Sequence, residues 1–335
     1  MALHRTLMRT IATLLTLIGV VAAAGPAAAA SRLPVVASFG VLADVVAQVG
    51  GDAVEVRSLV DAGSDVHVFQ PGPNHARQLA DARLVVINGL GFEGWIERLI
   101  RSSGYRGPVA VATVGIEPLR VAEPHDHGGA TGGARGSAKG GANTGAPGTA
   151  HGADPHAWQS VPNMKRYVAN VADALCAADA GACKGFRANA ARYLQVLDDL
   201  DREIRGALAA VPAERRKVIT SHGAFAYYAR EYGVQFLAPV GVSTDTEPSA
   251  AAVGRLIRQI RKEKVGAFFV EGISDPRLIE RIRSETGGAQ PGRLYSDGLS
   301  APDGPAPTYE AMMRFNTSSI TRALSAPAAI PAAGQ

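Results

Sequence analysis

The sequence predicts an α/β protein with two lobes, each a parallel sheet flanked by helices, and one long helix joining them. Short β-branched runs alternate with longer amphipathic stretches, which is typical of parallel sheets with helices on both faces. Four strand–helix units fall in each half of the chain, which indicates two similar lobes. Ligands of such sheets bind in the crevice beyond the carboxyl ends of the strands, so we expect side chains from distant parts of the sequence to converge there.

Residues 1–30 are expected to be a cleaved signal peptide. Arg5 and Arg9 form a basic start, an apolar stretch runs from Ile11 to Ala24, and small residues precede Ser31. The apolar stretch is too short to predict a transmembrane helix, although an uncleaved anchor is the alternative. No cysteine lies near the cleavage site to accept a lipid. We therefore expect a free periplasmic protein that begins near Ser31.

Residues 31–183 are expected to form the N-terminal lobe. Its strands are short runs rich in valine and isoleucine, and its helices are the amphipathic stretches between them. The expected strands are Val35–Phe39, Val54–Val60, Leu84–Asn88 and Val109–Thr113, and the expected helices are Val41–Val49, Pro73–Ala82 and Trp95–Ser102.

Residues 122–153 differ in composition from the rest of this lobe. They are rich in glycine and alanine and offer almost no apolar surface to offset the entropy of ordering, so we expect a disordered insertion. His125, His127 and His151 lie in it. They are either a mobile metal-collecting patch or incidental residues of a linker, and composition leaves both open.

The two cysteines, Cys176 and Cys183, lie close together in the sequence. In an oxidising compartment such a pair is expected to form a disulfide that closes a small loop. Two free thiols are the alternative. A metal role is disfavoured because no histidine is nearby.

Residues 184–210 are expected to form the helix that joins the lobes. Glycines occur only near its two ends, at Gly185 and Gly206, so its middle offers no hinge. A surface helix of one lobe is the alternative, because periodicity alone does not separate the two. The apolar residues on the helical repeat are Tyr193, Leu194, Val196, Leu197, Leu200, Ile204 and Leu208.

Residues 211–329 are expected to form the C-terminal lobe, after the break at Pro212. Its pattern repeats that of the first lobe. The expected strands are Lys217–Thr220, Gln235–Pro239, Ala267–Val270 and Leu294–Ser296, and the expected helices are Ala250–Glu263 and Asp275–Thr286.

The charge balance excludes a nucleic-acid surface. The net charge of +4 falls to about +2 once Arg5 and Arg9 are removed with the signal. There is no basic stripe, and aromatic residues make up only 6% of the chain.

Four metal-ligating residues stand in polar, turn-rich corners outside the apolar segments: His67, His156, His222 and Asp297. His222 and Asp297 each end a strand-like run, and prolines stiffen the stretches around His67 and His156. Short rigid corners hold ligands in place before the metal arrives. Three imidazoles and one carboxylate form a four-coordinate set suited to Zn²⁺.

The motifs around these residues resemble those of the metal-binding substrate-binding proteins of ABC transporters, the family with zinc- and manganese-binding periplasmic members. The resemblance covers Leu33 to about Ser325. The motifs are a histidine followed by an aromatic residue and prolines at His67, Asp-Pro-His-x-Trp at His156, Ser-His-x-Ala-Phe-x-Tyr at His222, and Tyr-Ser-Asp-x-Leu-Ser at Asp297.

The resemblance implies two lobes joined by a long helix, with the metal in the cleft between them. His67 and His156 would come from the first lobe, and His222 and Asp297 from the second. It also implies a monomer that captures a divalent metal and delivers it to an inner-membrane permease with its ATPase. Manganese-binding members usually carry glutamate where this chain has His222, so we expect Zn²⁺, with Mn²⁺ as the alternative.

Other residues near the expected cleft receive weaker expectations. Asp65, Asp154 and Glu271 are candidate acceptors for the imidazole N–H groups of metal-bound histidines, and Asp154 is alternatively a helix cap. Trp158, Phe225 and Tyr227 are expected to pack in the core. His4 and His75 are expected to bind no metal.

Two functions from other classes compete with transport. A secreted zinc hydrolase would keep three protein ligands and a place for water, whereas four candidate ligands occur here without a His-Glu-x-x-His motif. We therefore do not expect an enzyme. An adhesin or scaffold with a structural metal is the other alternative, and it would lose its fold when the metal is removed.

Overall fold

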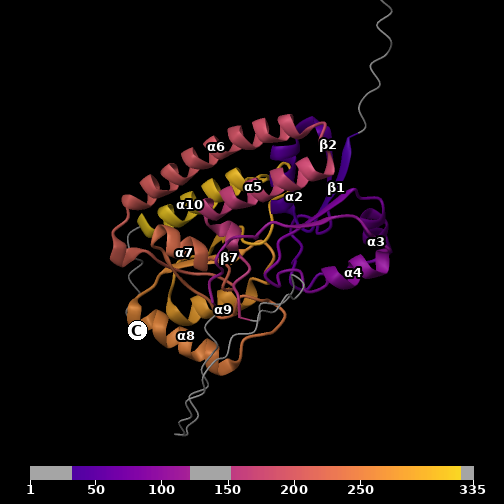
Figure 1. Cartoon of the computed structure of the whole chain (residues 1–335). Coiled ribbons are helices and arrows are strands. Elements are labelled where there is room, and N and C mark those ends of the chain that lie inside the picture. The colour runs from indigo at the N-terminus through magenta and orange to yellow at the C-terminus, as the bar shows by residue number, and fades with distance from the viewer. Residues whose placement is uncertain (1–31, 121–151, 326–335) are drawn as a thin grey trace, which may run out of the picture. The chain divides into compact units, whose positions relative to one another are not determined.

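The computed structural model describes residues 32–120 and 152–325. Two four-stranded sheets, both entirely parallel, form the centres of two lobes, and helices pack around them (Figure 1). The predicted α/β class with two parallel-sheet lobes is therefore confirmed. Within these residues, no helix is long and apolar enough to cross a membrane.

The N-terminal lobe follows the predicted alternation of strand and helix. Its elements in chain order are β1 (Leu33–Ala37), α2 (Gly40–Gly50), η1 (Gly51–Ala53), β2 (Val54–Ser58), α3 (Pro73–Ala80), β3 (Leu84–Ile87), α4 (Ile96–Ser103), β4 (Val109–Val111), η2 (Ala157–Gln159) and α5 (Val161–Ala178).

The long helix α6 (Cys183–Ala209) comes next, followed by the C-terminal lobe. The elements of that lobe are η3 (Ala213–Arg215), β5 (Lys217–Ile219), α7 (Ala226–Tyr232), β6 (Gln235–Leu237), α8 (Ala250–Glu263), β7 (Ala267–Glu271), α9 (Arg277–Thr286), β8 (Gly292–Leu294) and α10 (Tyr309–Ser325).

Both sheets have the same strand order. It is β2-β1-β3-β4 in the first lobe and β6-β5-β7-β8 in the second. In each sheet the chain leaves the first strand for one side and later returns to the other, which creates a topological switch point beside β1 or β5. Crevices at such points are where open α/β sheets bind ligands.

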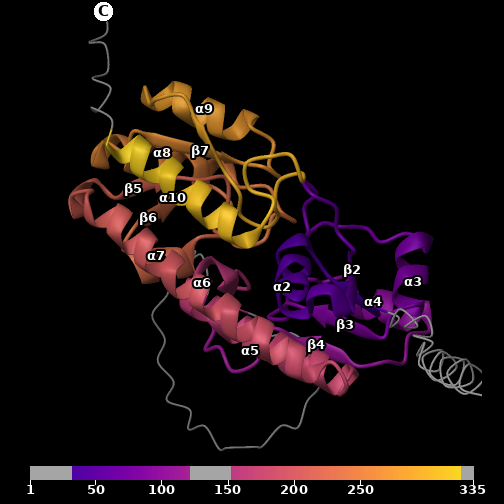
Figure 2. The ribbon, with the colours of Figure 1, turned by 90° about the horizontal axis from the view of Figure 1, so that it is seen from above.

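Helix α6 runs alongside both lobes (Figure 2) and is bonded to each. Near its start, Asn189 donates a hydrogen bond to the carbonyl of Val49 at the end of α2. Near its end, Asp201 accepts a hydrogen bond from Tyr232 of α7, and Glu203 pairs with Arg314 of α10. The predicted connecting helix is confirmed, with bounds one residue from those expected.

One apolar core continues from the first lobe into the second. It includes α2 and α5 side chains, Trp158, and the buried Tyr309 and Met312 of α10. A second, smaller core lies between the C-terminal sheet and α8 and α9, and it contains Ile219, Ile257 and Ile279 among others. The lobes therefore share their main core, whereas the outer layer of the second lobe has its own.

All eight predicted strands form, although the starts of two strands shift and every strand ends one or two residues from its predicted end. β1 begins two residues earlier than predicted, at Leu33, and β8 covers Gly292–Leu294 instead of Leu294–Ser296. Both shifts follow the ladder, because Leu33 pairs with Val54 and Gly292 pairs with Phe269. Backbone pairing with a neighbour, which carries no sequence pattern of its own, sets these ends.

Three further expectations concern the disulfide, the signal peptide and the insertion. The predicted disulfide between Cys176 and Cys183 is present, and it joins the end of α5 to the start of α6. The expected signal peptide at 1–30 lies outside the described residues. So does most of the expected insertion at 122–153, including His125, His127 and His151.

Candidate metal centre

The four predicted ligands come from four separate corners of the fold. His67 lies between β2 and α3, and His156 lies immediately before η2. His222 follows β5 and Asp297 follows β8. His156, His222 and Asp297 are buried, and the His67 side chain is only 5% exposed. The two lobes therefore each supply two ligands to one buried point.

The ligand atoms converge closely. His67 Nε2 lies 3.4 Å from His156 Nε2 and 3.4 Å from Asp297 Oδ2. Asp297 Oδ1 lies 3.4 Å from His156 Nε2, and Asp297 Oδ2 lies 3.2 Å from His222 Nε2. One ligand atom from each residue lies within 4.8 Å of every other.

These distances fit a metal ion. In a tetrahedral zinc site with bonds of about 2.0–2.1 Å, neighbouring ligand atoms lie about 3.3–3.4 Å apart. Among the described residues, His222 Nε2 and both carboxylate oxygens of Asp297 are buried without a hydrogen-bond partner. Buried polar atoms are rarely left so, and a shared cation would satisfy all three.

Each of the three candidate histidine ligands has its backbone N–H bonded to a carboxylate. Asp65 Oδ1 accepts from His67 N at 2.9 Å, and Asp154 Oδ1 accepts from His156 N at 2.9 Å. Both pairs have the local sequence Asp-x-His, the spacing of an Asx turn. In the second lobe Glu271, at the end of β7, accepts from His222 N at 2.9 Å and from Ser221 N at 2.8 Å.

Two of these carboxylates also approach the imidazole rings. Asp154 Oδ1 lies 2.7 Å from His156 Nδ1 in hydrogen-bond geometry. Glu271 Oε2 lies 2.7 Å from His222 Nδ1, without hydrogen-bond alignment. A proton held on Nδ1 leaves the Nε2 lone pair free for metal, so both carboxylates favour the tautomer that binds.

Asp65 does not fill the role expected of it. Its second oxygen accepts a hydrogen bond from Thr244 Oγ1 at 2.6 Å instead of approaching the His67 ring. Thr244 lies in the loop between β6 and α8, so this bond crosses from one lobe to the other. The expectation for Asp65 was wrong because its Asx turn points the carboxylate toward the opposite lobe.

Electrostatics couples the ligands to one another. Burial alone would lower the pKa of His156 and of His222, but the negative charges of Asp297, Asp154 and Glu271 outweigh it and raise both pKa values, that of His222 strongly. Burial would raise the pKa of Asp297, but His222 and His156 hold it well below its usual range. The two histidines therefore favour the ionised form of Asp297, and Asp297 favours protonation of the two histidines.

Three further residues brace the corners, and sequence reasoning did not assign them this role. Trp158 Nε1 and Gln159 Nε2 both donate to the carbonyl of Ser296, at 2.9 and 2.8 Å, so the corner of His156 is tied to that of Asp297. Asn88, after β3, donates to the carbonyl of Pro155 at 2.9 Å. For these bonds between corners, the only hint in the sequence was the Trp of the motif Asp-Pro-His-x-Trp.

The remaining predictions concern three aromatic residues and the histidines that were not expected to bind metal. Trp158, Phe225 and Tyr227 are buried in the main core, as expected. His75 is remote from the ligand set, and its Nδ1 accepts the backbone N–H of Gly72 at the start of α3. His4 lies outside the described residues.

Comparisons with known sequences agree on one family. Residues 35–323 match the family described as zinc-uptake complex component A, periplasmic. The iron-binding protein YfeA of Yersinia pestis is 31% identical over 299 residues, covering 89% of this chain and 88% of that protein. The manganese ABC transporter substrate-binding lipoprotein PsaA of Streptococcus pneumoniae is 26% identical, covering 88% and 89%.

Solved structures agree as well. The periplasmic zinc binding protein TroA from Treponema pallidum superposes with a TM-score of 0.76 at 26% identity, covering 88% of this chain and 100% of that one. A Mn-bound periplasmic metal binding protein from candidatus liberibacter asiaticus gives a TM-score of 0.73 at 27% identity, with the same coverage.

Proposed function

The chain belongs to the family of periplasmic zinc-uptake component A proteins, and from this premise we propose that it captures Zn²⁺ through His67, His156, His222 and Asp297. It is a metal-binding substrate-binding protein of an ABC transporter, and such proteins are not enzymes.

The convergence of the four ligands carries this proposal. Three Nε2 atoms and one carboxylate from remote parts of the chain surround one buried point, and their spacing suits a tetrahedral ion. Because the carboxylates behind His156 and His222 already orient the rings, little has to be reordered when the ion arrives.

The donor set supports zinc as the cargo. Three imidazoles are borderline ligands that suit Zn²⁺, whereas Mn²⁺ is better served by oxygen ligands. Manganese is the second candidate, because PsaA is named for manganese and the solved relative from liberibacter is Mn-bound. Both Asp297 oxygens face the histidines, so a larger coordination number is also within reach of this site.

We further propose that the loaded protein docks on a membrane permease, whose ATPase drives uptake, and that it acts in the periplasm after cleavage near Ala30. Substrate-binding proteins of ABC transporters work with such a permease and ATPase. Several relatives are named lipoproteins, whereas this chain has no cysteine near the expected cleavage site.

Calorimetric titration of chelator-stripped protein tests this function. We expect one Zn²⁺ per chain, bound more tightly than Mn²⁺, and a protein that stays folded without metal. A zinc affinity unchanged by His156→Ala would contradict the ligand assignment. Loss of the fold on chelation would favour the structural-metal alternative.

A further inference from the structure

Two cavities are lined by close sequence neighbours of the four ligands, and each cavity has lining residues from both lobes. The larger, about 790 Å³, is a groove formed by the β6–α8 loop, α8 and α9. Asp65 and Ser221 line it, and these are near neighbours in sequence of His67 and His222. The groove thus reaches two of the four ligand corners.

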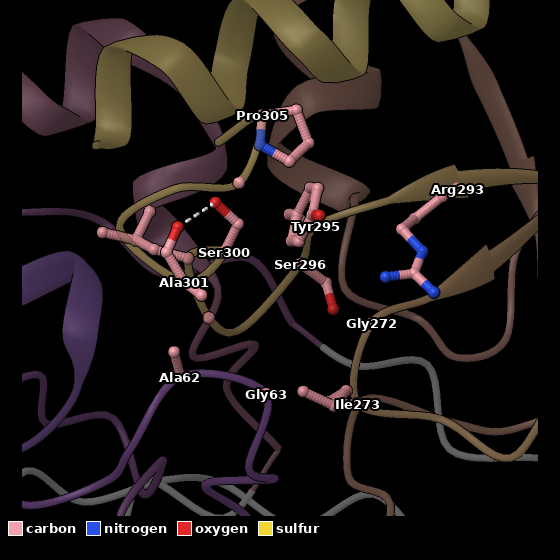
Figure 3. A pocket seen from close by; sticks show the side chains of 13 residues that line it. Ala62, Gly63, Gly272, Ile273, Arg293, Tyr295, Ser296, Ser300, Ala301 and Pro305 are labelled. Atoms are coloured by element: carbon pink, nitrogen blue, oxygen red, sulfur yellow. Dashed lines mark hydrogen bonds between the residues drawn. The ribbon is translucent and has the colours of Figure 1, made fainter. Parts of the chain in front are cut away.

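The smaller cavity, about 320 Å³, adjoins the groove at Ile273, which lines both. It is lined by Ser296 and Gly298, which flank Asp297, and by Ala62 and Gly63 of the first lobe (Figure 3). Arg293 is the only charged residue among the described residues that line it. This cavity is the alternative path between solvent and the metal centre.

The two cavities differ in the net charge of the residues that line them. The carboxylates that line the groove outnumber its arginines by two, since Arg277 pairs with Asp275 and Arg281 pairs with Glu285, whereas Asp65 and Glu247 add negative charge. A cleft with a net negative charge raises the local concentration of cations. The groove therefore attracts a divalent cation, and the cavity beside Arg293 repels one.

A single hydrogen bond joins the groove wall to the His67 corner. Thr244 donates to Asp65 Oδ2 at 2.6 Å, while Asp65 Oδ1 holds the backbone of His67. The equivalent second oxygens in the other corners make no such cross-lobe bond: Asp154 Oδ2 has no hydrogen-bond partner among the described residues, and Glu271 Oε2 faces the His222 ring. We call the Asp65–Thr244 bond the clasp.

The two sides of the clasp differ in their packing, because Val66, next to Asp65, is buried in the main core, whereas Thr244 lies beside the smaller core. Its Thr244 side belongs to the loop leading into α8, and that helix packs in the smaller core of the second lobe. The corners of His156 and Asp297 are instead tied together through Trp158 in the main core. Segments with fewer buried contacts open more readily than those in a main core.

We propose that the metal reaches and leaves its ligands through this groove, and that the Asp65–Thr244 clasp closes the path by holding His67 in place. The inference rests on the proposed function, because it presumes that the four ligands bind metal reversibly. It assigns Asp65 and Thr244 as positioning residues that act through His67, and Glu247 as a charge that speeds capture.

The first test measures association by stopped flow with Zn²⁺ in 0.15 M salt, where charges act over about 8 Å. Glu247→Lys should slow association about fourfold, and the effect should shrink at higher salt. Glu280→Lys, on α9 outside the groove, and Arg293→Glu, in the other cavity, should each change it less than twofold. Faster association in Arg293→Glu with no effect of Glu247→Lys would overturn the choice of path.

The second test measures dissociation into excess chelator. Thr244→Val keeps the shape of the side chain and removes the clasp, so zinc should leave about 10- to 100-fold faster, the effect of losing a hydrogen bond to a carboxylate. The matched control is Thr246→Val, in the same loop, where the hydroxyl has no hydrogen bond among the described residues. An unchanged dissociation rate in Thr244→Val would overturn the clasp.

The experiments distinguish a failure of the proposed function from a failure of the proposed metal path. If the unmodified protein binds no metal at the four ligands, the proposed function fails and no rates can be measured. If it binds zinc normally and the groove and clasp variants behave like their controls, only the path is wrong. Folding of each variant is checked by its far-UV circular dichroism and its melting temperature without metal.

Discussion

Glu271 offers the sharpest test of how the centre is oriented. Its Oε1 accepts two backbone N–H groups, from Ser221 and His222, while its Oε2 lies 2.7 Å from His222 Nδ1. Glu271→Gln keeps the size of the side chain but gives one end two N–H donors. If the amide oxygen stays on the backbone N–H groups, the NH₂ faces Nδ1 and favours the tautomer with its proton on Nε2, where the metal binds. In the opposite orientation the amide NH₂ faces the backbone N–H groups of Ser221 and His222, so donors face donors and no hydrogen bond forms.

Either orientation weakens the metal site while the ligand itself remains. Changes to residues that orient metal-bound histidines typically reduce affinity about 10- to 100-fold, which corresponds to about 1.4–2.7 kcal/mol. Because both orientations of the glutamine conflict with a neighbour, we expect the upper part of this range. The carboxylate is buried, so solvent screening does not reduce the effect.

The assay is a competition titration of zinc against a chelator of known affinity, with melting temperatures of the metal-free proteins as a check on folding. Glu263→Gln is the matched control, because Glu263 pairs with Lys217 at the surface of the same lobe. A zinc dissociation constant for Glu271→Gln within threefold of the unmodified protein would refute the tautomer argument.

Three other predictions follow from the same structure. His222→Glu should weaken zinc binding and strengthen manganese binding, so the manganese dissociation constant divided by that of zinc should fall in calorimetric titration. A rise in this quotient would contradict the donor argument. Since carboxylates raise the pKa of His156 and His222 in the metal-free protein, protons compete with zinc already above the ordinary imidazole value of about 6.5. Affinity should therefore fall as pH drops from about 8 to 5, with proton release measured by titration in buffers of different ionisation enthalpy; binding without proton release would contradict it. Replacing Cys176 and Cys183 by serine removes a disulfide of sequence separation 7 and should lower the free energy of unfolding by about 2.5 kcal/mol, measured in denaturant, without changing zinc affinity.

The sequence was sufficient to predict the strands because they are short, β-branched and regularly spaced. It identified four candidate ligands because His222 and Asp297 end strand-like runs, prolines stiffen the stretches around His67 and His156, and all four lie in motifs that resemble those of a known family.

Helix α10 has no counterpart among the predicted elements. Asn316 and Thr317 interrupt its apolar stripe, yet both are buried. Asn316 bonds to the backbone of Tyr295, and Thr317 bonds to the hydroxyl of Tyr228. These tertiary partners, which periodicity does not reveal, make polar residues acceptable in the core.

The bracing of the site was beyond sequence reasoning for a related reason. Thr244 and Asp65 are 179 positions apart, and Trp158 and Ser296 are 138 apart. Nothing in either local sequence identifies the partner. The Asp-x-His spacing at His67 and His156 is different, because an Asx turn is a local structure. It could have predicted the backbone bonds of Asp65 and Asp154, although not the direction of their second oxygens.

The apolar core that continues beneath both lobes restricts how the cargo can be handed over. A wide hinge opening of the two lobes would expose Trp158, Tyr309 and Met312, which are fully buried. Each large apolar side chain loses about 1.5–3 kcal/mol on returning to water, so such an opening would consume much of the stability of a typical domain. A membrane partner that extracts the ion therefore needs to loosen only the corner loops at the rim, while the body of the protein stays closed.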